Sequence, residues 1–378
     1  MKTTHYIITI TTIIISSILT SSSIPITISN LCNQHDKKVL LNIRNSLGNL
    51  SNFPSWTEDG ACCDWFGVTC GAPGAEDRVT GLSIKEWDTI SGVIPAHLAA
   101  ELPYLNGLYF TSLPGLVGGI PSELKKIPRL RYLTITTTNV SGPIPDFLGE
   151  LKHLQQLDLS NNHLSGTIPP SLGTLPKLAL LRLNRNQLSG SIPESLGNLV
   201  DIVSFSLAYN RLSGQVPKSL GKLHPIVLDL SRNRLSGDAS FLFGGSKSIN
   251  TLTLARNFLE FDFSKVVPPK GLAKLDVSHN MIYGTIPKGL LKGLLAFNAS
   301  YNRLCGEIPK PGSFWCRISI CTFRTSVSVG RHWSHASENW AFFFWLLGCA
   351  FDEMWCSLRR LASMHQALIS LVQFFFYG

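Results

Sequence analysis

Between Val79 and Pro309, apolar and polar positions follow one pattern that recurs every 22 to 24 residues. In LQQLDLSNN, residues 154–162, Leu157 and Leu159 alternate with polar neighbours, which is typical of a short strand that buries its leucines on one face. A Leu-Ser-Gly-x-Ile-Pro segment is expected to turn the chain, and a return segment such as residues 171–178 points leucines inward from the convex side. Because no unit can bury its apolar face alone, the pattern predicts a stacked solenoid with a parallel sheet.

An asparagine follows the strand in eight units, and two weaker copies precede these, with Thr89 and Gly115 in place of the asparagine. The asparagine amide can satisfy backbone groups at the turn, so stacked copies should form a ladder from coil to coil. Ten units of this length lie in the leucine-rich-repeat range. The eight asparagines are Asn139, Asn162, Asn186, Asn210, Asn233, Asn257, Asn280 and Asn302.

Residues 1–29 have the features of a secretory signal peptide. Lys2 precedes an apolar, Thr-rich run from Tyr6 to Leu19, and small residues follow it. A membrane anchor is the alternative, but the run is shorter than the ~20 residues that a spanning helix needs. We expect cleavage between Thr20 and Asn30, and secretion would permit disulfides.

Residues 30–78 are predicted to cap the first coil. Asp36 is expected to cap a helix whose apolar residues recur at helical spacing: Val39, Leu40, Ile43 and Leu47. Trp56 and Trp65 are interpreted as packing residues.

Four cysteines lie in this segment, and they fit disulfides better than a zinc site. Two of the four are adjacent, and no histidine lies nearby at ligand spacing. The four are Cys32, Cys62, Cys63 and Cys70.

Several segments together resemble one plant family. The Leu-Ser-Gly-x-Ile-Pro signature is of the plant-specific class, LCNQHDKKVLLNIRNSLGN precedes WTEDGACCDWFGVTC, and GDASFLFG, NFLEFDFSKV and YNRLCGEIP follow. From residue 31 to about 314 the chain resembles the polygalacturonase-inhibiting proteins, plant cell-wall inhibitors of fungal pectin-degrading enzymes.

The resemblance implies an α/β fold: a right-handed leucine-rich-repeat solenoid of ten plant-type repeats over residues 79–314, with a concave parallel β-sheet and a helical, disulfide-bonded N-terminal cap. It pairs Cys32 with Cys62 and Cys63 with Cys70. It also implies a secreted protein of the plant cell wall that needs no cofactor.

Residues 315–378 are expected to lie outside this fold. In RTSVSVGRHWSHAS, residues 324–337, codons that encode Thr-Ser-Val-Ser-Val-Gly can, when they are read one base out of frame, encode Asn-Lys-Cys-Leu-Cys-Gly. The C-terminal cap of the family that the chain resembles begins with this segment. We therefore expect a frameshift between Cys305 and Thr325. The uncapped last repeat should leave Leu304, Ile308 and the strand edge at Phe297 exposed, and Cys305 without a partner.

The apolar segments of this tail could instead suggest a membrane anchor. Residues 340–351 are too short to span a bilayer, and residues 361–377 are interrupted by His365 and Gln366. A stable anchor is therefore not expected.

A net charge of +9 favours acidic partners. We expect no nucleic-acid partner, no metal and no catalysis. Asp158, Ser160 and His163 are close in sequence, but Asp158 lies on a repeating structural strand, so a catalytic triad is not expected.

Binding is expected on the concave strand face, where the side chains between buried leucines form an array. Five of them directly precede a repeat asparagine and form one column: Arg185, Tyr209, Arg232, Arg256 and His279. The other candidates are Gln155, Gln156, Asp158, Ser160, Arg182, Asn184, Ser206, Asp229, Thr253 and Asp276.

Two functions from different classes fit this array. The first is inhibition of a fungal endopolygalacturonase by covering its cleft, with the basic column also holding polygalacturonate (pectin). The second is a receptor-like or developmental interaction protein that binds a plant peptide or a receptor ectodomain.

Glycosylation sequons begin at Asn49, Asn139 and Asn298. Asn49 is preferred, because Asn139 is expected on the ladder and Asn298 on a strand.

Overall fold

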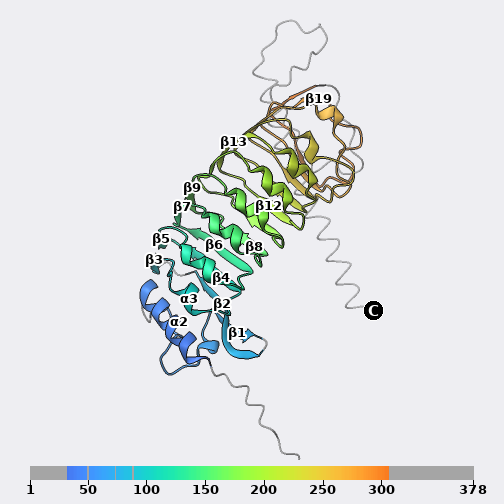
Figure 1. Cartoon of the computed structure of the whole chain (residues 1–378). Helices are drawn as coiled ribbons and strands as arrows, with labels where there is room; N and C mark the ends of the chain where they lie inside the picture. Colours follow the sequence, from blue (N-terminus) through green and yellow to red (C-terminus); the bar gives the residue numbers. More distant parts are fainter. Residues whose placement is uncertain (1–31, 49–50, 73, 87–88, 306–378) are drawn as a thin grey trace, which may run out of the picture.

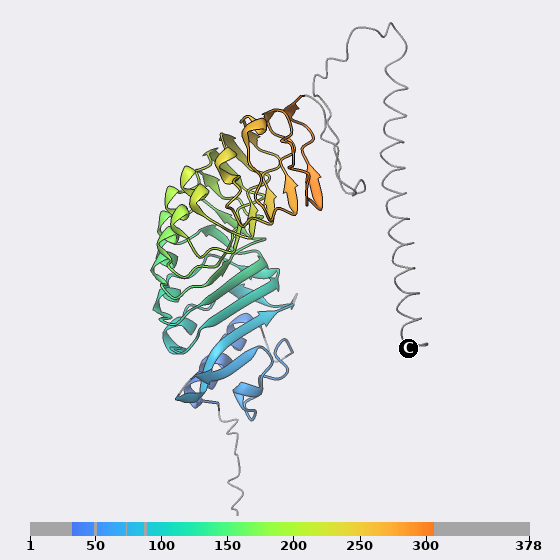
Figure 2. The same ribbon diagram turned by 90° about the vertical axis from the view of Figure 1, so that its right-hand side faces the viewer.

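The computed structural model describes residues 32–48, 51–72, 74–86 and 89–305. They form a curved stack of coils, with one sheet along the inner side and short helices along the outer side (Figures 1 and 2). The expected signal peptide, the residue 315–378 tail, Ile308, the proposed frameshift and the Asn49 sequon lie outside the described residues.

The large sheet of the described residues has 11 strands, ordered as they occur along the chain. β1 (Val68–Ala72) runs antiparallel to β2, whereas the pairs that follow are parallel. Each predicted repeat therefore contributes one parallel strand. The ten parallel strands are β2 (Ala75–Lys85), β4 (Gly107–Leu113), β6 (Tyr132–Thr138), β8 (Gln156–Asp158), β10 (Leu180–Arg182), β12 (Ser204–Ser206), β14 (Val227–Asp229), β16 (Thr251–Thr253), β18 (Lys274–Asp276) and β20 (Ala296–Asn298).

The Leu-Ser-Gly segments do more than turn the chain, which the sequence analysis missed. They form short strands that pair with the same segment of a neighbouring coil. Gly166 and Gly190 both have φ 77°, a left-handed conformation that glycine adopts without steric cost. These strands are β3 (Ser91–Val93), β5 (Gly115–Val117), β7 (Ser141–Pro143), β9 (His163–Ser165), β11 (Ser189–Gly190), β13 (Arg211–Gln215), β15 (Arg234–Gly237), β17 (Phe258–Leu259), β19 (Tyr283–Gly284) and β21 (Arg303–Leu304).

The return segments form short helices on the convex side, as their leucines predict. Leu172, Leu175 and Leu178 are buried. Gly173 permits close stacking, because an added Cβ would overlap the backbone of Ser195 in the next coil. These helices are α3 (Leu98–Glu101), η2 (Ser122–Lys126), η3 (Asp146–Glu150), η4 (Pro170–Thr174), η5 (Glu194–Asn198), η6 (Lys218–Lys222), η7 (Ser240–Leu242) and η8 (Phe263–Lys265).

The asparagine ladder is present in seven coils. Asn186 Nδ2 donates to the carbonyl oxygens of Leu183 (3.1 Å) and of Leu159 in the preceding coil (2.8 Å), and its Oδ1 accepts from Leu164 N (3.0 Å). The amide therefore satisfies groups of two coils at once. The two backbone acceptors recur at Asn162, Asn210, Asn233, Asn257, Asn280 and Asn302.

The ladder assignment of Asn139 was wrong. Asn139 is exposed, and its Nδ2 donates to Pro114 O (2.7 Å). NVSGPIP is one residue shorter than NHLSGTIP, so the buried Thr138 holds the ladder position and bonds to Asn162 through its hydroxyl.

Similar corrections apply to the two weak copies. Strand register places Leu113, rather than Gly115, opposite Thr138. In the first copy the equivalent position is residue 87, outside the described residues, rather than Thr89.

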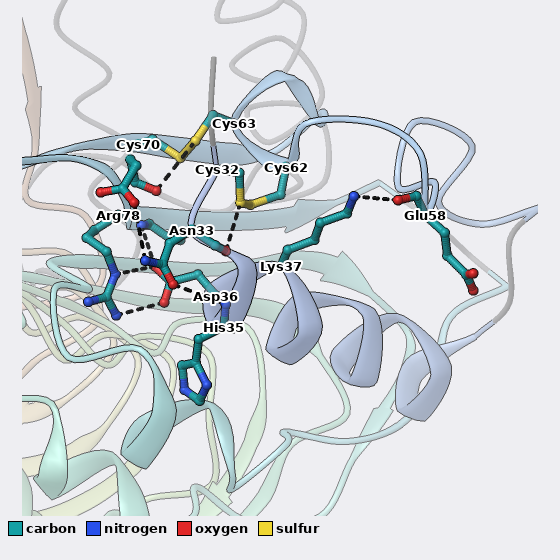
Figure 3. The surroundings of a disulfide bond; sticks show 12 residues. Cys32, Asn33, His35, Asp36, Lys37, Glu58, Cys62, Cys63, Cys70 and Arg78 are labelled. Carbon is teal, nitrogen blue, oxygen red and sulfur yellow. Dashed lines mark hydrogen bonds and ion pairs between the residues drawn. A yellow bond between two sulfur atoms is a disulfide. The ribbon is translucent and has the colours of Figure 1, made fainter. Parts of the chain in front are cut away.

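Helix α2 (Gln34–Leu47) forms the N-terminal cap, and its four predicted apolar residues are buried. Its N-cap is Asn33, whose Oδ1 accepts from His35 N (3.1 Å), so the assignment of Asp36 as the cap was wrong. Asp36 points inward from the first turn and accepts from Arg78 Nε (2.9 Å), Arg78 Nη2 (2.8 Å) and Val79 N (2.8 Å) (Figure 3). This fully buried carboxylate therefore ties the cap to β2.

The cap also contains the two disulfides that the family resemblance implied. Cys32 is bonded to Cys62, which begins the short helix η1 (Cys62–Asp64), and Cys63 is bonded to Cys70 (Figure 3).

Two tryptophans pack in the cap, as expected. Trp56 and Trp65 are buried and stacked, with ring centroids 5.4 Å apart.

At the other end, the expected exposure of Leu304 is not observed, because Leu304 is buried, as is the side chain of Phe297. The expected open strand edge at Phe297 is present among the described residues, where β20 is the last strand of the sheet. Phe297 stands in register with Leu275 of the preceding coil, which places its ring in the line of inward-facing side chains. Cys305 is exposed and unbonded to another cysteine in the described part of the chain.

Candidate functional site

The candidate site is the concave face of the large sheet, made by side chains that alternate with buried leucines. Strand register places the central candidates in one row across consecutive strands, and the residues that precede the ladder positions form a second row at the strand ends. The central row contains Asp158, Arg182, Ser206, Asp229, Thr253 and Asp276.

The candidates differ in how much of each side chain reaches solvent. Exposed residues can contact a partner directly, whereas the buried ones mainly shape the floor. Arg182, Arg185, Tyr209, Arg232 and Arg256 are exposed, Gln155, Gln156, Asn184, Asp229, Thr253, Asp276 and His279 are half-buried, and Asp158, Ser160 and Ser206 are buried.

The floor is held by short polar contacts. Asp158 Oδ1 accepts from Ser160 N (3.1 Å) and Ser160 Oγ (2.6 Å), and Arg182 Nη1 lies 3.6 Å from Asp158 Oδ2. Asp229 and Asp276 each accept from the backbone N–H two residues later, at 3.0 Å. These carboxylates therefore organise the strand ends.

At one border of this face lies what we term the border column: Asn161, Arg185, Tyr209, Arg232, Arg256, His279 and Tyr301. Each of the seven has a φ between 54° and 57°, a left-handed conformation that is uncommon for residues other than glycine. The backbone N–H groups of the first six donate to the next coil, as in Arg185 N to Ala208 O (2.9 Å). Stacking of the coils therefore holds the side chains in line.

The border column is rich in unneutralised positive charge. The Tyr209 ring lies between two guanidinium groups, with its centroid 4.2 Å from Arg185 and 4.7 Å from Arg232. Within the described ranges, no carboxylate pairs with Arg185, Arg232 or Arg256. These cations therefore remain available to an anionic partner.

Four residues in or beside the border column escaped the sequence analysis. Asn161 precedes Asn162 and Tyr301 precedes Asn302, so the rule that found the other members would have included both. Exposed Arg211 and Arg234 follow their ladder asparagines, on β13 and β15. The Asn-Arg-Leu-Ser-Gly segment, which occurs at both positions, is the sequence feature that could have identified these two arginines.

His279 follows Arg256, the last arginine of the border column. Its ring stacks on Tyr301, with centroids 4.1 Å apart. Burial, followed by the positive charge of Arg256, lowers the pKa of His279 below 6.5. Its Nδ1 is buried and has no hydrogen-bond partner among the described residues.

Neither catalysis nor metal binding is favoured by the geometry of the groups considered above. Ser160 donates to Asp158, whereas His163 is exposed on β9, where its Nε2 lies 3.0 Å from Asn139 Oδ1. The serine, aspartate and histidine thus do not form a relay.

Three cap sulfurs, of Cys32, Cys62 and Cys63, lie within 4.8 Å of one another, but all are in disulfides and cannot act as thiolate ligands. Across the described ranges, no helix combines the length and apolar character needed to cross a membrane.

Comparisons with known proteins agree with this architecture. Residues 118–291 match the model of a leucine-rich repeat region, and residues 33–71 match that of a leucine rich repeat N-terminal domain. The chain is 54% identical to a polygalacturonase inhibitor of Pyrus communis over 272 residues, which cover 72% of this chain and 81% of the relative.

Two further relatives carry other names. The chain is 51% identical to leucine-rich repeat protein FLOR 1 of Arabidopsis thaliana, over 69% of this chain and 79% of that protein. The crystal structure of a plant ice-binding protein superposes with a TM-score of 0.72 at 40% identity, over 78% of this chain and 97% of the other. The same fold thus occurs in a polygalacturonase inhibitor and in a plant ice-binding protein.

Proposed function

Since the chain belongs to the polygalacturonase-inhibitor family of leucine-rich-repeat proteins, we propose that it binds and inhibits fungal endopolygalacturonases through its concave face. It would do so outside the plant cell, in the wall. Covering the enzyme's cleft excludes pectin without chemistry by the inhibitor, which fits a face that presents charged and aromatic side chains rather than a catalytic relay.

The observation that carries the proposal is the unneutralised border column. Consecutive coils of a parallel sheet lie about 4.8 Å apart, so Arg232 and Arg256 offer closely spaced positive charges. Such a row suits carboxylates on an enzyme surface and those along polygalacturonate. We therefore include pectin as a second ligand of the same border.

The test begins with inhibition. Purified protein is added to a panel of fungal endopolygalacturonases, and release of reducing ends from polygalacturonate is measured. We expect inhibition of at least one enzyme, with retention on pectin that weakens as salt rises. A panel with no inhibited member would contradict the proposal.

A triple variant then locates the interface. Arg185, Arg232 and Arg256 are each replaced by Asn, which tolerates their backbone conformation. Binding should weaken and its salt dependence should flatten, because fewer exposed charges contribute.

A matched control removes three positive charges from the convex side. Lys125 on η2 and Lys218 and Lys222 on η6 are exposed, and we replace each by Asn. If both triple variants weaken binding equally, net charge rather than the border column is responsible.

The alternative is a plant interaction protein that binds a peptide or a receptor ectodomain. It is supported by the similarity to the leucine-rich-repeat ectodomain of a plant membrane receptor kinase of Arabidopsis thaliana, at 31% identity and a TM-score of 0.65, over 72% of this chain and 33% of that one. The same concave face would serve. Specific, saturable binding to a receptor ectodomain, together with inhibition of none of the fungal enzymes, would favour this alternative.

A further inference from the structure

The border opposite the arginines carries an exposed apolar patch. Val200, Val203 and Ile226 are 71%, 47% and 50% exposed, whereas residues of this type are usually buried. Val203 and Ile226 lie on adjacent coils, since Ile226 N donates to Val203 O (2.9 Å). We call these three residues the apolar patch; Leu180 and Val227 lie half-buried at its side.

The fold does not require apolar side chains at these positions. Backbone hydrogen bonds align Val203 and Ile226 with the residues at the same position of other coils: Arg131, Gln155, Ala179, Asn250, Ala273 and Leu295. Since arginine, glutamine and asparagine occupy this position elsewhere, repeat architecture does not require the apolar side chains of the patch. Large apolar side chains occur there on two adjacent coils, at Val203 and Ile226, and again at the exposed Leu295.

These same coils carry the cationic part of the border column. Val203 precedes β12 and Tyr209 follows it, six residues later, which corresponds to about 20 Å of strand. Arg185 and Arg232 flank Tyr209 in the adjacent coils. Across the sheet, an apolar contact surface thus faces a positively charged one, over a floor that includes the buried Ser206.

We propose that the apolar patch receives aliphatic or aromatic side chains of a protein partner whose carboxylates meet the arginines of the border column. This inference rests on the proposed function, in which the partner is the enzyme. The charge of the column selects an acidic partner, and the patch distinguishes protein from pectin. A polygalacturonate chain presents hydroxyls and carboxylates, which gain little from contact with valine and isoleucine.

The experiment replaces Val203 and Ile226 together by Thr. Threonine keeps the β-branched shape that suits strands but adds a hydroxyl, so folding should be retained. For an enzyme that the unmodified protein inhibits, we expect roughly tenfold weaker inhibition, since about 1.4 kcal/mol of apolar burial is lost. Retention on pectin should not change.

The matched control replaces Val93 and Val117 by Thr. They are 57% and 44% exposed, and they face each other in register on β3 and β5 of the side sheet. This variant should inhibit as strongly as the unmodified protein. Thermal melting of both double variants checks that they remain folded.

The outcomes separate the two proposals. Full inhibition by the Val203 and Ile226 variant overturns the apolar-patch inference and leaves the proposed function standing. Equal loss of inhibition and pectin retention also overturns it, because the patch would not then distinguish protein from polysaccharide. If the unmodified protein inhibits no enzyme of the panel, the proposed function fails and the inference fails with it.

Discussion

Replacing Arg256 by Asn is expected to stabilise the protein while weakening its binding to acidic ligands. Arg256 has a φ of 57°, and a left-handed backbone costs an ordinary residue about 1–2 kcal/mol. Asparagine tolerates this conformation, and Asn161 already holds it in the β8 coil. Within the described residues, Arg256 has neither an ion pair nor a ring contact to lose.

We therefore expect a gain of about 1 kcal/mol, or about 2–4 °C in the melting temperature. Two comparison variants test the cause. Arg232→Asn gains the same backbone relief but loses the contact with the Tyr209 ring, worth about 0.5–1 kcal/mol at an exposed site, so little net change is expected. Arg211→Asn alters an exposed arginine that lacks the left-handed conformation and should stay within about 0.5 kcal/mol of the unmodified protein.

Thermal melting followed by circular dichroism ranks the three variants, and pectin retention is measured on the same samples. A melting temperature for Arg256→Asn at or below that of the unmodified protein, with Arg211→Asn unchanged, would refute the backbone argument. Stronger pectin retention by Arg256→Asn would refute the assignment of the border column to anion binding.

Further predictions concern other parts of the molecule. Asp36→Asn should destabilise the protein by about 2 kcal/mol in denaturant melts, because the buried side chain at position 36 loses its charged hydrogen bonds to the half-buried Arg78; an unchanged midpoint would contradict this. The pKa of His279 is lowered from its ordinary value by burial and by Arg256, so the unfolded chain binds the proton more readily than the folded one. Stability should therefore fall as pH drops below the ordinary pKa of histidine, and His279→Asn should lose less stability on acidification. Mass spectrometry of secreted protein should find sugar on Asn139, which is exposed, in preference to Asn298, which is half-buried on β20. A chain with the family-type ending should melt higher than this one, since a disulfide to Cys305 contributes ~2–4 kcal/mol; equal melting would count against the frameshift hypothesis.

The repeat architecture could be predicted because the sequence of a single repeat contains the residues that form the strand and the turn of one coil. Buried Leu157 and Leu159 define the strand, and the following Asn162 closes the turn. The pairing of Leu-Ser-Gly segments into strands was not predictable in this way. It depends on the distance between coils, which the pattern within one repeat does not specify.

Errors arose where local spacing was ambiguous. Asn33 and Asp36 both suit a helix start, and only the inward position of Asp36 against Arg78 decides between them. At the third coil the turn segment is one residue shorter, so aligning the repeats on the asparagine placed the ladder at Asn139 instead of Thr138. Counting back seven residues from Pro145, the spacing between Asn162 and Pro169, would have given Thr138. The apolar patch escaped notice because exposure of a valine at a strand start depends on its neighbours.

In the border column, the fold sets the backbone conformation, whereas the side chains vary from coil to coil. Asn161, Arg185, Tyr209 and Arg232 differ in size and charge, yet their φ values are 56°, 57°, 56° and 54°. The buried leucines and the ladder therefore impose the backbone conformation whatever side chain it carries. A protein under selection for stability alone would place asparagine or glycine there. Arginine and tyrosine are retained at a conformational cost, which favours their having a role in contact with a partner rather than in holding the coils together.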